Sequence, residues 1–190
     1  MKNRTIAAMA ALVLVLATAA GAAEQELTLG VRFGLAIDES SLGSLPYEFK
    51  QNAGAAYGLC LGIRQGHLGA EVGYVHISRT LSPVAEAPPE AVETAFRLNS
   101  LSFNVIYYPL LSATLRPYLT GGYAFYRLDF EAYGEDSNSG FNAGAGLNLL
   151  LLRRLSVSLE GRYHWVDFSV EGQALDVNNW IVTLGLNYHF

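Results

Sequence analysis

The chain has no long apolar run beyond its first 23 residues, only one cysteine, and fewer basic than acidic residues. The missing run excludes a helical membrane span in that part of the sequence. Cys60 has no second cysteine for an internal disulfide, so we expect a small packed side chain. Twelve basic residues against seventeen acidic ones give a formal net charge of −5, which argues against a nucleic-acid partner.

The first 23 residues have the pattern of a processing segment. Lys2 and Arg4 precede an apolar run over residues 6–20, and small residues at 20–23 come before three polar ones. This order predicts a cleavable secretory signal peptide over 1–23, followed by one exported domain over 24–190. The alternative, an uncleaved membrane helix, leaves the small-residue segment without a purpose.

Residues 180–190 carry the clearest pattern in the chain. Every second residue is apolar or aromatic, and the residues between them are mostly small or polar. A period of two predicts a β-strand with two unlike faces. About ten residues with an aromatic at each end is the length of a strand that crosses a membrane. The apolar set is Trp180, Val182, Leu184, Leu186, Tyr188 and Phe190.

Seven further segments alternate in the same way, with large apolar residues on one face and glycine, serine or polar residues on the other. The alternation in the seventh slips near Val166, which predicts a bulge or the end of the membrane zone. Because backbone groups in hydrocarbon must all be paired, the eight segments predict a closed, antiparallel, up-and-down transmembrane β-barrel. The segments are about 27–37, 54–65, 68–78, 98–108, 116–130, 140–151, 155–170 and 180–190.

The connections between these segments alternate between long and short, as expected when successive strands cross a barrier. The long polar connections are 38–53, 79–96, 132–139 and 171–179. The first two are acidic, and we expect them to be the candidate sites for a surface partner. The alternative is that they are solvated connectors without a dedicated partner.

Several short phrases resemble those of a known family. They include Pro117-Tyr118, Gly121-Gly122-Tyr123, the Leu-Glu-Gly-Arg-Tyr of 159–163, and the terminal Tyr188-His189-Phe190. The chain resembles the small outer-membrane β-barrels of Gram-negative bacteria, the OmpA/OmpX type. The resemblance implies an outer-membrane location among lipid and lipopolysaccharide, a monomer, and insertion by the outer-membrane assembly machinery. It also implies that the assembly signal is formed by Leu184, Leu186, Tyr188 and Phe190.

Five charged residues fall on the face opposite the apolar one. An eight-stranded barrel has an interior just wide enough for side chains to fill it, and an unpaired buried charge is costly. We therefore expect an interior of glycines, hydroxyls and paired charges with a structural role; a narrow proton or ion path is the alternative, and an open pore is not expected. The five residues are Arg32, Arg64, Glu71, Glu160 and Arg162.

Two arrangements of histidines are candidate sites. His164 and His189 point inward on neighbouring strands but at different heights, so we expect no metal site and no cofactor. His76 and Ser78 share the outward face of one strand, and their spacing is similar to the base and nucleophile of outer-membrane lipid A deacylases. The orienting acid of such a triad is missing, because Asn99 stands at the matching height.

Taken together, the sequence predicts a non-enzymatic outer-membrane barrel that serves envelope integrity or surface interaction through its loops. One alternative is a lipid-modifying enzyme that uses His76 and Ser78. Another is a soluble, lipocalin-like barrel with its apolar face turned inward around a small ligand. The glycine- and serine-rich second face favours the membrane barrel, because it suits a tight interior.

Overall fold

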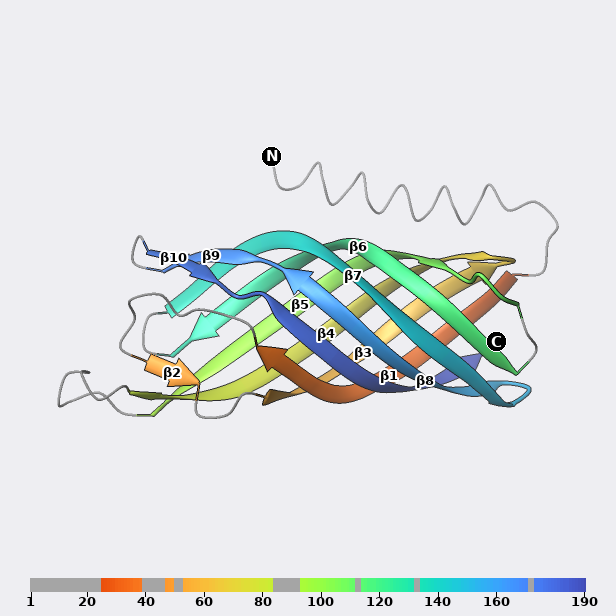
Figure 1. The fold of residues 1–190 in the computed structure, drawn as a ribbon, viewed down its shortest axis with the longest axis horizontal. Coiled ribbons are helices and arrows are strands. Elements are labelled where there is room, and N and C mark those ends of the chain that lie inside the picture. The colour runs from red at the N-terminus through yellow and green to blue at the C-terminus, as the bar shows by residue number, and fades with distance from the viewer. Residues whose placement is uncertain are drawn as a thin grey trace.

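The computed structural model describes residues 25–38, 47–49, 53–83, 93–111, 114–131, 134–170 and 173–190, so the predicted signal peptide lies outside this part of the chain. No helix in these ranges is long and apolar enough to cross a membrane. Eight long strands form the body of the molecule (Figure 1). They are β1 (Gln25–Asp38), β3 (Ala53–Gln65), β4 (Leu68–Pro83), β5 (Thr94–Tyr107), β6 (Leu115–Phe130), β7 (Gly134–Leu152), β8 (Leu155–Trp165) and β11 (Asn179–His189).

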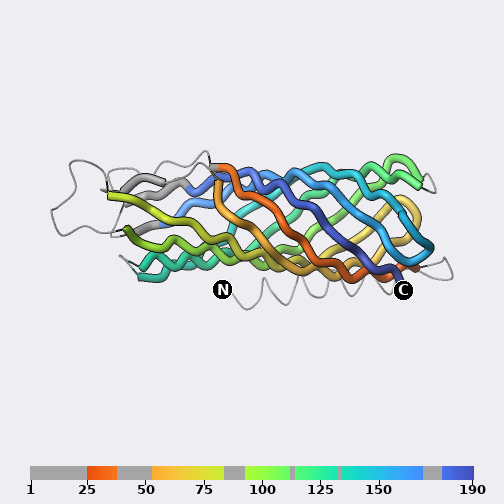
Figure 2. The backbone as a smooth tube through the Cα atoms, turned by 90° about the horizontal axis from the view of Figure 1, so that it is seen from below, coloured from red at the N-terminus to blue at the C-terminus, as the bar shows by residue number. Residues whose placement is uncertain are grey.

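These strands close into an antiparallel barrel, which confirms the predicted fold class. Each strand pairs with its neighbours, and β11 returns to β1, where Thr28 lies opposite His189 and Ile37 opposite Trp180. The pairing of β4 with β5 joins the remaining two edges of the sheet. Figure 2 shows the strands inclined to the long axis of the barrel, as closure requires.

The two ends of the barrel differ. The start of β1, the end of β11 and the tight turn after β3 lie at one end; there Gly66 has φ of 57°, which glycine accepts without strain. The other end carries three short strands: β2 (Tyr47–Phe49), which pairs with the end of β4, and the hairpin of β9 (Asp167–Val170) and β10 (Gln173–Asp176). We call these the short-turn end and the long-loop end; in outer-membrane barrels the short turns face the periplasm.

Several strands extend further toward the long-loop end than the sequence predicted. β4 continues to Pro83 and β5 begins at Thr94, so both borders of the predicted loop 79–96 belong to the barrel wall. The predicted loop 38–53 contains β2. The connection predicted over 79–96 is therefore shorter than expected, because β4 and β5 do not stop where the membrane pattern does, whereas the connection over 38–53 keeps its predicted borders.

The later connections are also partly ordered. β7 begins at Gly134, inside the predicted loop 132–139, and β10 lies inside the predicted loop 171–179. The slip in alternation at Val166 is a real interruption: β8 ends at Trp165, and β9 starts at Asp167. The sequence predicted a single strand over 155–170.

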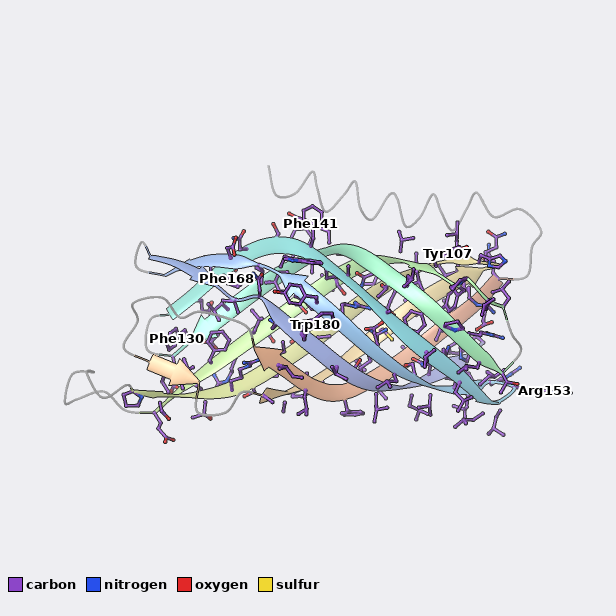
Figure 3. All side chains as sticks on the ribbon, in the orientation of Figure 1. Tyr107, Phe130, Phe141, Arg153, Phe168 and Trp180 are labelled. Carbon is purple, nitrogen blue, oxygen red and sulfur yellow. The ribbon has the colours of Figure 1, made fainter. Side chains whose placement is uncertain are left out.

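Over most of its height the barrel presents large apolar side chains to the outside (Figure 3). β11 alternates strictly between buried and exposed residues, so that Leu184 is 59% exposed while Thr183 is buried. The same holds on β1, where Phe33 is 63% exposed and Arg32 is buried. Such a belt is stable against lipid and unfavourable in water, which is inconsistent with the lipocalin-like alternative.

Toward the long-loop end, the apolar residues lie on the inner face of the barrel wall instead of the outer one. On β4 the outward Tyr74 is exposed, whereas the inward Val75, Ile77 and Leu81 are buried, and Thr80 faces outward. The exchange is expected where the wall leaves the bilayer, because the surroundings of the outer face become water there. The prediction of a polar interior holds only in part here, because apolar side chains predominate while Arg79 and His164 are also buried. The cluster, called the upper core here, contains Ala36, Ala56, Val75, Ile77, Leu81, Phe96, Leu98, Ala124, Tyr126, Leu128, Phe130, Val166, Phe168, Val177 and Ile181.

Aromatic rings mark the borders of the apolar belt. Near the level of the exchange, Tyr163 packs against Trp165 and Trp180 with ring centroids 4.8 and 5.1 Å apart. At the short-turn end, Tyr188 packs edge-on against Phe190 at 4.9 Å. Amphipathic rings prefer the two interfaces of a membrane, so the hydrocarbon zone lies between these groups.

Candidate functional site in the barrel interior

Four charged side chains from three strands meet inside the barrel, on the short-turn side of the upper core. Each arginine contacts both carboxylates, so Arg32 and Arg162 form a closed ring with Glu71 and Glu160. Arg32 lies 2.5 Å from Glu71 and 3.1 Å from Glu160; Arg162 lies 3.2 and 2.9 Å from the same two residues. All four are between 3 and 6% exposed, and Tyr118 donates a further hydrogen bond to Glu160. The ring has no net charge, so the barrel interior carries no uncompensated charge at this level.

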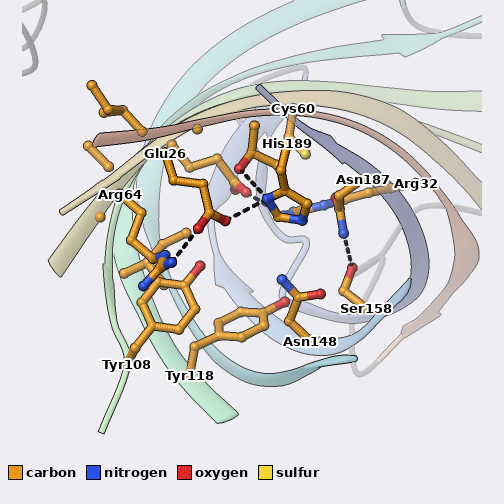
Figure 4. A pocket seen from close by; sticks show the side chains of 17 residues that line it. Glu26, Arg32, Cys60, Arg64, Tyr108, Tyr118, Asn148, Ser158, Asn187 and His189 are labelled. Carbon is orange, nitrogen blue, oxygen red and sulfur yellow. Dashed lines mark hydrogen bonds and ion pairs between the residues drawn. The ribbon is translucent and has the colours of Figure 1, made fainter. Parts of the chain in front are cut away.

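Arg64, the fifth predicted member, lies apart from the ring and nearer the short-turn end. It pairs with Glu26, whose carboxylate also lies 3.3 Å from Arg116 Nη1 and 2.6 Å from His189 Nδ1. Figure 4 shows Glu26 pointing toward both Arg64 and His189. The prediction of one interior network of five charges is thus corrected to a ring of four with Arg64 apart. Alternation determines which face of the wall a side chain occupies but not its position along the barrel axis.

The sequence reasoning missed Glu26, and a usable signal was present. Glu26 has the same inward parity as Arg32, and the antiparallel register places it directly opposite Arg64 on β3. The Arg64 guanidinium also lies 5.5 Å from the ring centre of Tyr108. Burial raises the pKa of Tyr108, which follows β5, to about 12, so its hydroxyl stays protonated at neutral pH.

A cavity of about 40 Å³ lies between the ring of four charges and the cluster that Glu26 forms with Arg64, Arg116 and His189, called the Glu26 cluster here. Arg32, Glu71 and Tyr118 are among its lining residues, as is Asn148, whose Oδ1 is buried without a hydrogen-bond partner in the described structure. Because one water needs roughly 10–15 Å³, the cavity has room for a few waters. This side of the interior is therefore suited to hydration.

On the opposite side of the ring the buried side chains are mostly apolar, although Arg79 is buried among them and donates to the Ala36 carbonyl at 2.8 Å. The upper core fills the barrel there, and Leu81, Phe96, Leu128 and Phe130 are at most 1% exposed. Apolar side chains packed to this degree leave no space for a hydrated ion. The described residues thus form no open solute path along the axis.

Ser156, His189 and Glu26 have distances that resemble a hydrolytic triad. The His189 ring lies 2.7 Å from Ser156 through Nε2 and 2.6 Å from Glu26 through Nδ1. A nucleophile must also be accessible to its substrate. Ser156 is 0% exposed and lines neither the cavity described above nor the opening at the short-turn end. These contacts therefore connect β1, β8 and β11.

His76 and Ser78 lie on the outward face of β4, near the level where the faces exchange. His76 Nδ1 is 2.8 Å from Asn99 Oδ1, and the His76 ring packs against Tyr57 with centroids 4.8 Å apart. Tyr74 donates to the same Asn99 oxygen. In the described structure, His76 makes no hydrogen bond to Ser78, and the group in the orienting position is an amide.

The two inward histidines, His164 and His189, have different contacts in different parts of the barrel. His164 Nδ1 lies 2.7 Å from the Tyr126 hydroxyl beside the upper core, whereas His189 belongs to the Glu26 cluster. His164 is opposite Asn179, at the far end of β11 from His189. Within the described ranges, no group of three His, Cys, Asp or Glu side chains is placed to hold a metal ion.

The four residues that the family resemblance assigned to an assembly signal all lie on β11 or directly after it. Leu184, Leu186, Tyr188 and Phe190 face outward, toward the lipid. Recognition of these side chains by assembly machinery remains a prediction. Their common face is compatible with recognition of an extended strand, because alternate residues of a strand point the same way.

An antiparallel barrel with a lipid-facing apolar belt, aromatic rings at both borders and an ion-paired interior is a transmembrane barrel of the outer-membrane class. Residues 8–190 match the family model described as "Outer membrane protein beta-barrel domain", and the chain belongs to this family. The protein is therefore located in the outer membrane. No curated protein matches the chain.

Solved structures support the fold. Neisserial surface protein A is 19% identical with a TM-score of 0.63, covering 87% of this chain and 97% of that one. The N-terminal β-barrel domain of OprF from Pseudomonas aeruginosa is 15% identical with a TM-score of 0.54 and the same coverage. Outer membrane protein W of E. coli is 16% identical with a TM-score of 0.50, covering 89% of this chain and all of the other. At these identities the likeness concerns the fold alone.

Proposed function

We propose that this outer-membrane barrel is non-enzymatic, acts as a monomer, and serves envelope integrity or surface interaction through its loops at the long-loop end. The observation that carries the proposal is the filled interior: a neutral ion-paired ring lies beneath a mostly apolar core. Such a barrel is suited to span the membrane and to carry loops. Its lipid-facing belt is in contact with lipid and lipopolysaccharide, and β11 is the segment offered to the assembly machinery.

The first test concerns transport. Vesicles containing the refolded protein are placed in isotonic sugar or amino-acid solutions, and swelling is followed by light scattering. We expect no swelling above that of protein-free vesicles, because side chains fill the axis. Swelling in a monosaccharide would contradict the proposal and would indicate a solute pore.

The two roles are separated by complementation. A strain without the protein receives either the full chain or a variant in which residues 84–92 are replaced by a short turn. If the shortened variant restores resistance to detergent, the barrel itself supports the envelope. If the full chain alone restores adhesion or another surface property, the loop carries the role. Failure of the full chain in both assays would contradict the proposal.

The lipid-modifying alternative rests on the position of His76 at the membrane border and on its hydrogen bond to Asn99. We expect the Ser78→Ala variant to leave the acylation of lipid A unchanged, because the described partner of His76 is the Asn99 amide and not a carboxylate. Mass spectrometry of lipid A from cells with the wild-type chain, the variant or neither checks this. A loss of one acyl chain that depends on Ser78 would establish an enzyme.

A further inference from the structure

The short-turn end of the barrel holds an open cavity of about 600 Å³, called the mouth here. It is formed where β1 begins, β11 ends and the turn between β7 and β8 reverses the chain. Its polar lining is unlike that of the apolar belt beside it. The lining residues that matter for its charge are Glu26, Arg64, Arg116, Arg153, Arg154 and His189.

The mouth is positively charged in a chain with net charge −5. Four arginines line it against one side-chain carboxylate, that of Glu26, which already contacts Arg64, Arg116 and His189. Arg154 donates to the Tyr188 hydroxyl at 3.2 Å. In the described structure, neither Arg153 nor Arg154 has a carboxylate within ion-pair distance. Acidic residues occur instead toward the long-loop end, among them Glu93, Asp129, Glu131, Glu135, Asp136 and Asp167.

The two unpaired arginines stand at the border of the apolar belt. Leu151 and Leu152, directly before them, are 56% and 63% exposed. Figure 3 shows Arg153 at the tip of the short-turn end. Long arginine side chains at such a border reach the level of lipid phosphates while their stems cover apolar surface. The nearest source of anions is therefore the surrounding leaflet.

We propose that the mouth binds the phosphate of an anionic phospholipid from the leaflet at the short-turn end. Arg153 and Arg154 contact the phosphate oxygens, since a guanidinium matches a phosphate with two parallel hydrogen bonds. Arg64 and Arg116, held by Glu26, add positive charge behind them. The acyl chains continue along the exposed leucines of β7. A lipid with net negative charge is preferred over a zwitterionic one because the lining carries more arginines than carboxylates.

The test uses the purified full chain in detergent micelles, titrated with phosphatidylglycerol or phosphatidylcholine, with bound lipid counted by native mass spectrometry. We expect wild-type protein to bind phosphatidylglycerol at least tenfold more tightly. The double variant Arg153→Gln/Arg154→Gln is expected to lose about thirtyfold in affinity, since each arginine near an anionic surface contributes about 1 kcal/mol. Arg153→Glu alone provides a second, charge-reversing test of the same turn.

The matched control is Arg97→Gln/Arg127→Gln, which removes the same charge from exposed pairs on the outer face near the long-loop end. It is expected to bind phosphatidylglycerol like the wild type. All variants must show the same heat-modifiable gel migration, so that folding and binding are separated. Unchanged binding by both turn variants would overturn the proposal. Displacement of the lipid by inorganic phosphate would show a free-anion site and would overturn the lipid assignment.

Discussion

Replacement of Glu160 by glutamine is expected to lower the free energy of unfolding by about 3–5 kcal/mol, the cost of breaking a buried charge pair. Glu160 accepts hydrogen bonds from Arg32, Arg162 and Tyr118. Glutamine has nearly the same shape but leaves the ring with one uncompensated positive charge inside the membrane. Urea unfolding in lipid vesicles, followed through the fluorescence of Trp165 and Trp180, measures the change.

The matched control is the same substitution at an exposed site. Glu135 pairs with Arg127 on the outer face near the long-loop end, and both side chains are more than half exposed. Because an exposed ion pair contributes at most about 1 kcal/mol, Glu135→Gln is expected to change stability little. Equal effects of the two substitutions would show that the ring does not stabilise the barrel through its charges.

The Leu81→Ala variant is expected to lose about 2–5 kcal/mol of stability, as buried leucines do when a cavity replaces them. Leu81 is 0% exposed in the upper core and lies opposite Thr94 of β5. The neighbouring Thr80 faces outward, and Thr80→Ala is expected to remain within about 0.5 kcal/mol of the wild type. The same urea titration measures both variants.

The Leu81→Ala variant also tests whether this residue belongs to the barrel wall or to the loop. The sequence placed this residue in a solvated connection over 79–96, where truncating a side chain costs little. A pair of small, equal effects at positions 80 and 81 would support that interpretation and would contradict the upper core. Limited proteolysis adds a local readout, because a weakened upper core should expose the ends of β4 and β5 to cleavage.

The sequence was sufficient for the fold because a lipid-facing wall has a strong signature. Alternating side chains on β1 and β11, aromatic residues near the ends of β11, and the long-short order of connections all lead to the same closed barrel. The upper core escaped notice for a physical reason. Beyond the bilayer the period of two continues, but the apolar residues move to the inner face, so Leu81, Phe96 and Leu98 no longer fit a pattern defined by the lipid side.

The sequence predicted that the charged side chains of the interior site point inward, but not where along the barrel axis each of them lies. Parity identified Arg32, Glu71, Glu160 and Arg162 as inward residues, and their pairing follows from the cost of a lone buried charge. Separating Arg64 from them required the register of β1 against β3, which depends on tilt and stagger around the whole barrel. Neither the tilt nor the stagger can be read from the sequence of a single strand.

The upper core fills the barrel interior toward the long-loop end. On its other side, the small cavity beside the buried charges shares Glu26, Arg64 and His189 with the mouth. The cavity beside the buried charges therefore opens toward the periplasmic compartment, whereas the loops face the other side of the membrane.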